Sequence, residues 1–287
     1  MCKIKYLILL LIIFCFTFAS CSSAPKNPGD VFTLRRQAED GLKNANREAA
    51  RGNLEVALSL LTGFKRNAVL ADDQSLIIRI SLSMGNVLFS LDRRQEAFAE
   101  WDLAISEAVS FGNKELLSVS KIFKARGNLL SDETRAASIL EEVNRESANI
   151  RSNRLFIAFS WQVRALALRS LKRWQEAENA SRQSLNIHEK DRHLENASFD
   201  WYTIASIRSL ADNTNGAIEA LESSIAIDRR IENSSGLAAS YRAMGDVYRR
   251  AGREEYALEA YKRAISILEA LGNDQEIAFL NRRINRN

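Results

Sequence analysis

The chain has 287 residues, of which 46% are hydrophobic and 26% are charged, and its formal net charge is +4. Its only two prolines, Pro25 and Pro28, lie near the N-terminus, and a long proline-free chain favours helices and argues against β-sandwiches and barrels. All three cysteines lie within the first 21 residues, which excludes a disulfide framework or a cysteine metal site in the rest of the chain.

The first twenty residues have the pattern of a signal peptide. Lys3 and Lys5 precede an apolar run, Tyr6–Phe18. This run has the length of a signal-peptide core and is too short to cross a bilayer core of about 30 Å. We therefore predict a signal peptide over residues 1–20 and export of the protein.

The residues around Cys21 resemble a bacterial lipobox, because Phe18, Ala19 and Ser20 precede the cysteine and two serines follow it. The resemblance implies cleavage before Cys21 and attachment of several acyl chains, such as palmitate, which together give a stable anchor. The alternative is ordinary signal cleavage, which would leave Cys21 as an unpaired thiol. With the anchor, residues 21–29 form a lipidated tether on a lipoprotein of the cell envelope, facing the periplasm or the cell surface. Either the inner or the outer membrane fits this pattern.

Loss of the signal peptide would leave the chain almost neutral. Lys3 and Lys5 are the only charged residues in positions 1–20, so their removal lowers the formal net charge from +4 by two. A nearly neutral chain lacks the electrostatic footprint of a nucleic-acid-binding protein.

A forty-residue repeat occupies the rest of the chain. Residues 97–106 and 257–266 share their pattern of alanines, aromatics and isoleucine. Aromatic residues precede three of the repeated alanines by sixteen positions, and a small residue such as Gly245 follows each aromatic by four. The repeated alanines are Ala57, Ala97, Ala137, Ala177, Ala217 and Ala257, and the aromatics are Trp161, Trp201 and Tyr241.

These positions resemble the tetratricopeptide repeat, in an extended variant of about forty residues. The resemblance implies an all-α, right-handed superhelical solenoid of about six helix–turn–helix repeats over residues 30–287. Small residues are needed where the two helices of a repeat cross, because only they let the backbones approach. The expected repeats are 38–77, 78–117, 118–157, 158–197, 198–237 and 238–272, with a capping helix at 274–284.

The third repeat does not fit one register. Gly127-Asn128 parallels Gly85-Asn86, but the following turn is then two residues shorter than in the other repeats. Either Ala136 or Ala137 can stand at the helix crossing in this repeat.

The sequence offers little for catalysis. His188 and His193 are five residues apart, whereas a zinc-protease helix needs histidines at i and i+4. We interpret residues 188–193 as a solvated charge run at a helix end. No nucleophile motif or phosphate loop appears, so we predict no enzyme activity, no cofactor and no metal site.

The remaining candidate is the inner, concave face of the solenoid. The resemblance places there a set of residues in which cations predominate, a composition that suits an acidic segment or a C-terminal carboxylate of a partner. Lys124 and Asn128 match part of the clamp that some relatives use for carboxylates. The full set is Arg79, Asn86, Lys121, Lys124, Asn128, Gln162, Arg169, Tyr202, Arg242, Asp246 and Arg249.

Together these features predict a non-catalytic scaffold that binds an envelope protein or peptide and no nucleic acid. The alternative is a periplasmic transport component, or a partner of a solute-binding protein, with a small-ligand pocket inside the superhelix.

Overall fold

The computed structural model describes residues 33–285. The predicted signal peptide, Cys21 and the tether lie outside these residues. The described part is all-α, as predicted, and the capping helix is α14 (Asp274–Ile284). Six helix pairs precede it: α2 (Leu34–Ala50) with α3 (Leu54–Leu70), α4 (Gln74–Ser90) with α5 (Arg94–Ser110), α6 (Lys114–Ser131) with α7 (Ala136–Ser147), α8 (Arg154–Ser170) with α9 (Trp174–Lys190), α10 (Leu194–Leu210) with α11 (Thr214–Arg230), and α12 (Ser234–Arg250) with α13 (Glu254–Ala270).

The forty-residue period sets where the helices begin. The first helix of every pair begins forty residues after the previous one, four residues before each repeat boundary expected from the sequence. A residue with positive φ ends most helices at twenty-residue intervals, and four of these residues are glycines: Gly52, Gly112, Gly252 and Gly272. Within residues 33–285 the series is interrupted only at positions 132 and 152, on either side of the irregular α7.

Five of the six repeated alanines are completely buried, but Ala137 is exposed. Its neighbour Ala136 is 1% exposed and takes the crossing position in the third repeat, so the placement of Ala137 there was wrong. The physical cause is the connection between α6 and α7. The Asp132 side chain accepts hydrogen bonds from Thr134 and starts a short 3-10 turn (Glu133–Arg135), which turns Ala136 toward α6.

The register of α6 follows from one tryptophan. Trp101 of α5 is 1% exposed, and its ring lies against two glycines on different helices. A Cβ on Gly85 of α4 would lie 2.2 Å from the Trp101 ring, and one on Gly127 of α6 would lie 2.3 Å from it. The two glycines therefore contact different edges of the Trp101 ring. They do not occupy equivalent positions in the two repeats.

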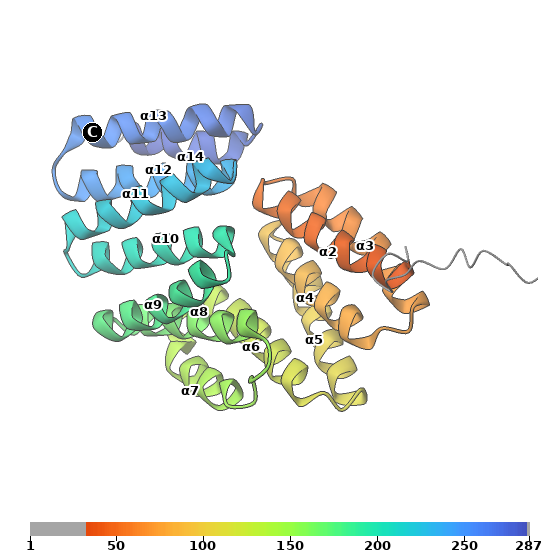
Figure 1. The fold of residues 1–287 in the computed structure, drawn as a ribbon. Coiled ribbons are helices and arrows are strands. Elements are labelled where there is room, and N and C mark those ends of the chain that lie inside the picture. Colours follow the sequence, from red (N-terminus) through yellow and green to blue (C-terminus); the bar gives the residue numbers. More distant parts are fainter. Residues whose placement is uncertain (1–32, 286–287) are drawn as a thin grey trace, which may run out of the picture.

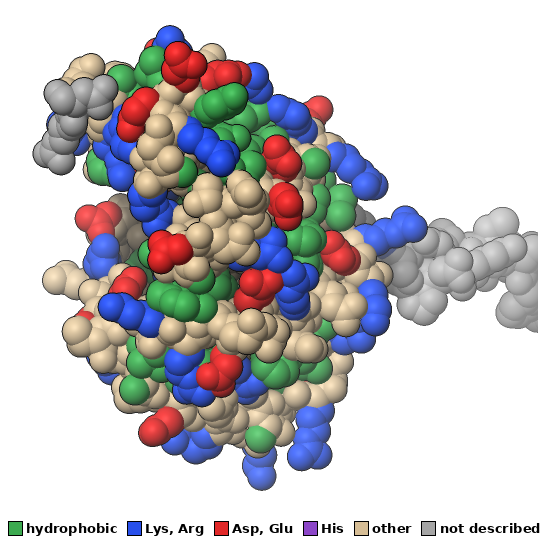
Figure 2. Space-filling model, turned by 90° about the vertical axis from the view of Figure 1, so that its left-hand side faces the viewer, with side chains coloured by type: hydrophobic (Ala, Val, Ile, Leu, Met, Phe, Trp, Pro, Cys, Tyr) green, Lys and Arg blue, Asp and Glu red, His purple; other side chains and the backbone are tan. Residues whose placement is uncertain are grey.

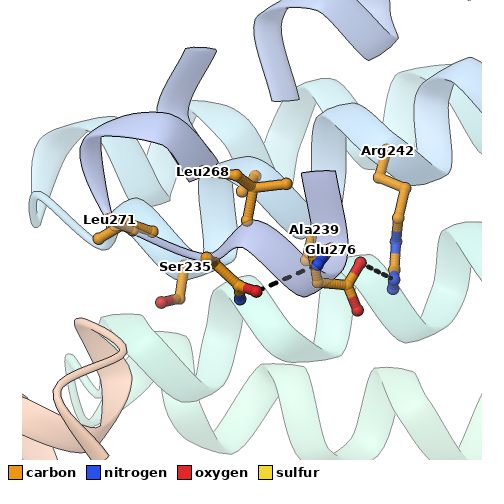
Figure 3. A pocket seen from close by; sticks show the side chains of 8 residues that line it. Ser235, Ala239, Arg242, Leu268, Leu271 and Glu276 are labelled. Atoms are coloured by element: carbon orange, nitrogen blue, oxygen red, sulfur yellow. Dashed lines mark hydrogen bonds and ion pairs between the residues drawn. The ribbon is translucent and has the colours of Figure 1, made fainter. Parts of the chain in front are cut away.

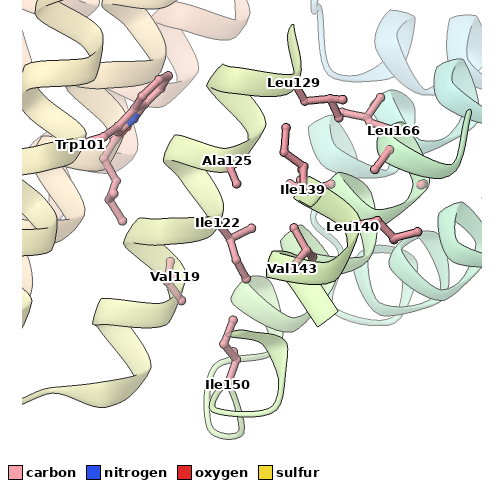
Figure 4. Packing of buried hydrophobic residues seen from close by; sticks show 14 of the residues in the cluster. Trp101, Val119, Ile122, Ala125, Leu129, Ile139, Leu140, Val143, Ile150 and Leu166 are labelled. Carbon is pink, nitrogen blue, oxygen red and sulfur yellow. The ribbon is translucent and has the colours of Figure 1, made fainter. Parts of the chain in front are cut away.

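Consecutive helices pack in sequence order and form a curved stack (Figure 1). The core runs through the stack as buried side chains from each pair and its neighbours, and Figure 4 shows the part between α6 and α7. Of the repeated aromatics, Tyr241 is buried, whereas Trp161 and Trp201 are half-buried at helix contacts. The curvature brings α2 of the first repeat into contact with α12 of the sixth.

Candidate binding surface

The first helices of the pairs form the inner layer of the stack. Neighbouring first helices contact one another along the series α2, α4, α6, α8, α10 and α12, whereas the second helices make no comparable contact within residues 33–285. In a curved two-layer stack the inner layer follows the shorter path, so its members approach more closely. The side chains that first helices direct away from the second helices therefore line the concave face.

Polar contacts between neighbouring first helices cross this inner face. Gln162 Nε2 donates to Asp200 Oδ1 over 2.8 Å, and Arg169 Nη1 donates to Ser206 Oγ over 3.2 Å. At the C-terminal end Arg242 pairs with Glu276 at 3.0 Å. Further contacts to α14 are Arg249 to the Arg283 carbonyl and Asp246 to the Arg283 guanidinium. Most predicted cations of this end are thus already neutralised or hydrogen-bonded within the chain.

The three residues predicted for the inner face of α6 face elsewhere. Lys121 pairs with Glu146 of α7 at 3.1 Å, and Lys124 pairs with Asp102 of α5, so both point toward second helices. Phe123 instead contacts the next first helix, where it stacks on Phe159 of α8 with 4.1 Å between ring centroids. Asn128 comes five residues after Phe123, about 140° further round the helix.

The misplacement came from equating Gly127 with Gly85, which shifts α6 by two residues. In the unshifted register Arg126 stands at the position of Asn86 and Asp246, both expected on the inner face. Burial lowers the pKa of Arg126, and this residue was missed from the sequence. The forty-residue spacing alone, applied without the shift, would have found it.

The remaining predicted residues lie on first helices. Arg79 is half-buried on α4 and forms no ion pair within the described part of the chain. Asn86 has a buried Oδ1 with no hydrogen-bond partner among residues 33–285. Tyr202 is half-buried on α10 and lines a cavity.

Two cavities occupy the same place in successive repeats. The first, of about 170 Å³, lies between α12, α13 and α14, and the Arg242–Glu276 ion pair forms part of its wall (Figure 3). The second, of about 210 Å³, lies between α10, α11 and α12. It is lined by Glu195, Ser198, Phe199, Tyr202, Ser224, Asp228, Asn233, Gly236, Ala239 and Ser240.

Residues 188–193 lie at the end of α9 as predicted, with Glu189, Lys190 and Arg192 exposed, but the prediction of a solvated run was wrong for His188. His188 is 2% exposed, and its Nδ1 lies 2.6 Å from Oδ2 of Asp200, which is 1% exposed. Burial raises the pKa of Asp200, against the hydrogen bonds that His188 and Gln162 make to it. No group of three or more histidine, cysteine or acidic side chains within residues 33–285 has the arrangement of a metal site.

The surface carries both signs of charge. On the face shown in Figure 2, Lys and Arg side chains alternate with Asp and Glu and with small hydrophobic areas. No helix within residues 33–285 combines the length and the apolar composition that a membrane span requires.

Comparison with known proteins supports the fold. Residues 198–270 match the tetratricopeptide repeat family. No curated protein matches the chain in sequence.

Several solved structures have the same fold at low sequence identity. A Rap protein in complex with Competence and Sporulation Factor shares 14% identity, with a TM-score of 0.59 and 86% of this chain and 74% of that chain covered. BtubC from P. vanneervenii shares 16%, with a TM-score of 0.52 and coverage of 84% and 92%. Kinesin light chain-like repeats from Podosopora anserina share 17%, with a TM-score of 0.50 and coverage of 68% and 96%.

Proposed function

We propose that the chain, which has paired helices throughout the described part and matches the tetratricopeptide repeat family over residues 198–270, is a non-catalytic scaffold whose concave face binds a protein or peptide partner. The observation that carries this proposal is the two-layer arrangement, in which the second helices and repeat contacts supply the stability. The inner face of the first helices is left free for a ligand. A Rap protein of this fold has been solved with Competence and Sporulation Factor bound, which shows that the architecture can hold a partner.

The size of the cavities favours a protein partner over the transport alternative. Sites for small molecules usually have about 300–1,000 Å³. The two cavities have about 170 and 210 Å³ and open at successive repeats along one face. Small, repeated recesses suit individual side chains of an extended peptide better than one enclosed ligand.

We further propose that the scaffold is a lipoprotein of the cell envelope, anchored through Cys21. This part of the proposal rests on the signal-peptide pattern of residues 1–20 and on the lipobox-like residues before Cys21. Replacing Cys21 with alanine would then release the protein from the membrane fraction with an unchanged circular dichroism spectrum. Equal membrane fractionation of both proteins would contradict the anchor.

The binding surface is tested by site-specific photo-crosslinking in the native cell. A photoreactive phenylalanine analogue at Arg79, a half-buried residue of α4 predicted for the inner face, is expected to capture a discrete protein partner. The same analogue at Tyr256, which is 60% exposed on the outer helix α13, is the control. Capture at Tyr256 without capture at Arg79 would move the binding surface to the outer layer.

A further inference from the structure

We propose that the cavity between α10, α11 and α12 is a subsite for an arginine side chain of the peptide bound on the concave face. The inference rests on the proposed function and names the chemistry of one contact in it. Two carboxylates and two aromatic rings line the cavity, and no Lys or Arg does.

The central group is the buried carboxylate of Asp228. This residue of α11 is 1% exposed, and its Oδ1 accepts a hydrogen bond from Asn233 Nδ2 over 2.8 Å. Its Oδ2 approaches the backbone of α12 so closely that a Cβ on Gly236 would lie 2.5 Å from it. The glycine therefore makes room for the carboxylate in the cavity wall.

Asp228 has no cation to pair with within the described residues, and the repeat register shows why. Forty residues earlier stands His188, which pairs with Asp200. Forty residues after Asp200 stands Ser240, a neutral residue, so this interface has no counterpart of the His188–Asp200 pair. A buried carboxylate without a counter-ion is costly, and a cationic ligand relieves that cost.

The surroundings of Asp228 add negative charge and hydroxyl groups at the wall of the cavity. Burial raises the pKa of Asp228, and the charge of Glu195 raises it further, against hydrogen bonds from Ser198 and Asn233. The serines of the wall bond mainly to each other, with Ser224 Oγ 2.9 Å from Ser198 Oγ and 3.0 Å from Ser240 Oγ. The described residues that line the cavity thus supply hydroxyls around the acid and no Lys or Arg.

The neighbouring cavity lacks this combination. Leu268 occupies the place of Asp228 there, and the acid Glu276 is already paired with Arg242. Of the two cavities, the one between α10, α11 and α12 is therefore complementary to a positive charge, because its acid Asp228 is not already paired.

The aromatic walls select the guanidinium among cations. Phe199 is 37% exposed beside the cavity, and Tyr202 lies one turn further along α10. A planar guanidinium stacks on aromatic faces and donates from a rigid fork to carboxylates, whereas an ammonium is a strongly hydrated point charge.

Saturation-transfer NMR with the detergent-solubilised full chain tests the subsite. The probes are three pentapeptides, acetyl-Ala-Ala-X-Ala-Ala-amide, in which X is arginine, citrulline or lysine. Citrulline keeps the shape of arginine without its charge. We expect the arginine peptide to bind about tenfold or more tightly than the citrulline peptide, with saturation strongest on its side-chain protons.

Three variants localise the effect. Asp228→Asn should abolish the preference for arginine over citrulline, and Glu195→Gln, at an exposed position, should reduce it. Glu219→Gln removes one charge from an exposed position of α11 and should leave the preference unchanged. If Asp228→Asn does not fold, the exposed Glu195→Gln variant carries the comparison.

Equal binding of the arginine and citrulline peptides would overturn the subsite, as would a preference that survives in Asp228→Asn. Tighter binding of the lysine peptide would overturn the assignment of a guanidinium. These failures are separable from failure of the scaffold, because crosslinking at Arg79 reports on the concave face whether or not arginine is preferred.

Discussion

His188 on α9 and Asp200 on α10 form a buried pair that joins the fourth repeat to the fifth, with 2.6 Å between Nδ1 and Oδ2. Both side chains are almost completely buried, and Asp200 also accepts a hydrogen bond from Gln162 Nε2. A buried pair of this kind is destabilising to break, because the remaining partner keeps its desolvated charge or dipole.

We expect His188→Ala to lower the free energy of unfolding by about 3–5 kcal/mol, measured by urea denaturation. The double variant His188→Leu with Asp200→Ser introduces the residues found at these repeat positions in later interfaces, Leu268 and Ser240. It should recover most of the loss. A double variant as unstable as His188→Ala would mean that the pair stabilises the fold by itself, beyond removing the cost of an unpaired buried group.

The alanine at a helix crossing limits the distance between two helices. Ala257 is completely buried between α12 and α13, so Ala257→Leu should lower the free energy of unfolding by about 1–3 kcal/mol. Ala137→Leu adds the same atoms at an exposed position and should change stability by less than about 0.5 kcal/mol. Thermal denaturation of both variants measures the loss of stability. Equal losses would mean that Ala137, and not Ala136, lies at the helix crossing of the third repeat.

Glu178 gives stability a defined dependence on pH. Burial alone would raise its pKa, but hydrogen bonds and charges from Arg208 and Arg182 outweigh burial and hold the pKa below the ordinary 4.5. Because the folded-state pKa is depressed, the stabilising contribution is complete above pH 4.5 and is lost as the pH falls through the lower folded-state value.

The measurement is urea unfolding at several pH values between neutrality and pH 3, for the parent protein and Glu178→Gln. The difference in stability between the two should shrink as the pH falls below about 4.5. A difference that is constant over this range would show that the ionised form of Glu178 is not what Arg208 stabilises.

The first and sixth repeats approach each other so closely at Gly52 that one larger side chain there should separate them. Gly52 has φ of +90°, and a Cβ on it would lie 2.6 Å from Ser235 Oγ of α12. Gly52→Leu should therefore push α2 away from α12 and increase the radius of gyration measured by small-angle X-ray scattering.

Gly112→Leu is the matched control for this change. Gly112 also has positive φ, at +69°, but a Cβ there would meet nothing within 4 Å. The control variant has the same kind of backbone strain, but its new side chain does not clash with another helix. An equal change in radius for both variants would assign the effect to strain and not to the contact.

The forty-residue spacing predicted the helices, their pairing and the buried alanines, because each repeat packs mainly against its own two neighbours. Local pattern therefore carries most of the fold. The prediction failed at α6, where the alignment of Gly127 with Gly85 replaced the forty-residue spacing. Trp101 fits between Gly85 and Gly127, and this non-equivalent use of two glycines displaced the expected inner face of α6 from Phe123 and Arg126 to Lys121 and Lys124.

The stack of paired helices can therefore be predicted from the amino-acid sequence, since alanine at a fixed period and turn residues at helix ends are short-range signals. Which polar side chains are buried, and which of them have a partner, depends on how the helices pack in space. His188 and Asp228 occupy the same repeat position, yet His188 lies 2.6 Å from Asp200, whereas Asp228 forms no ion pair within the described residues and has Ser240 at the repeat position of Asp200. That difference arises from the residue that the next helix brings opposite each of them, because the electrostatic environment of a buried group is set by its neighbours in space.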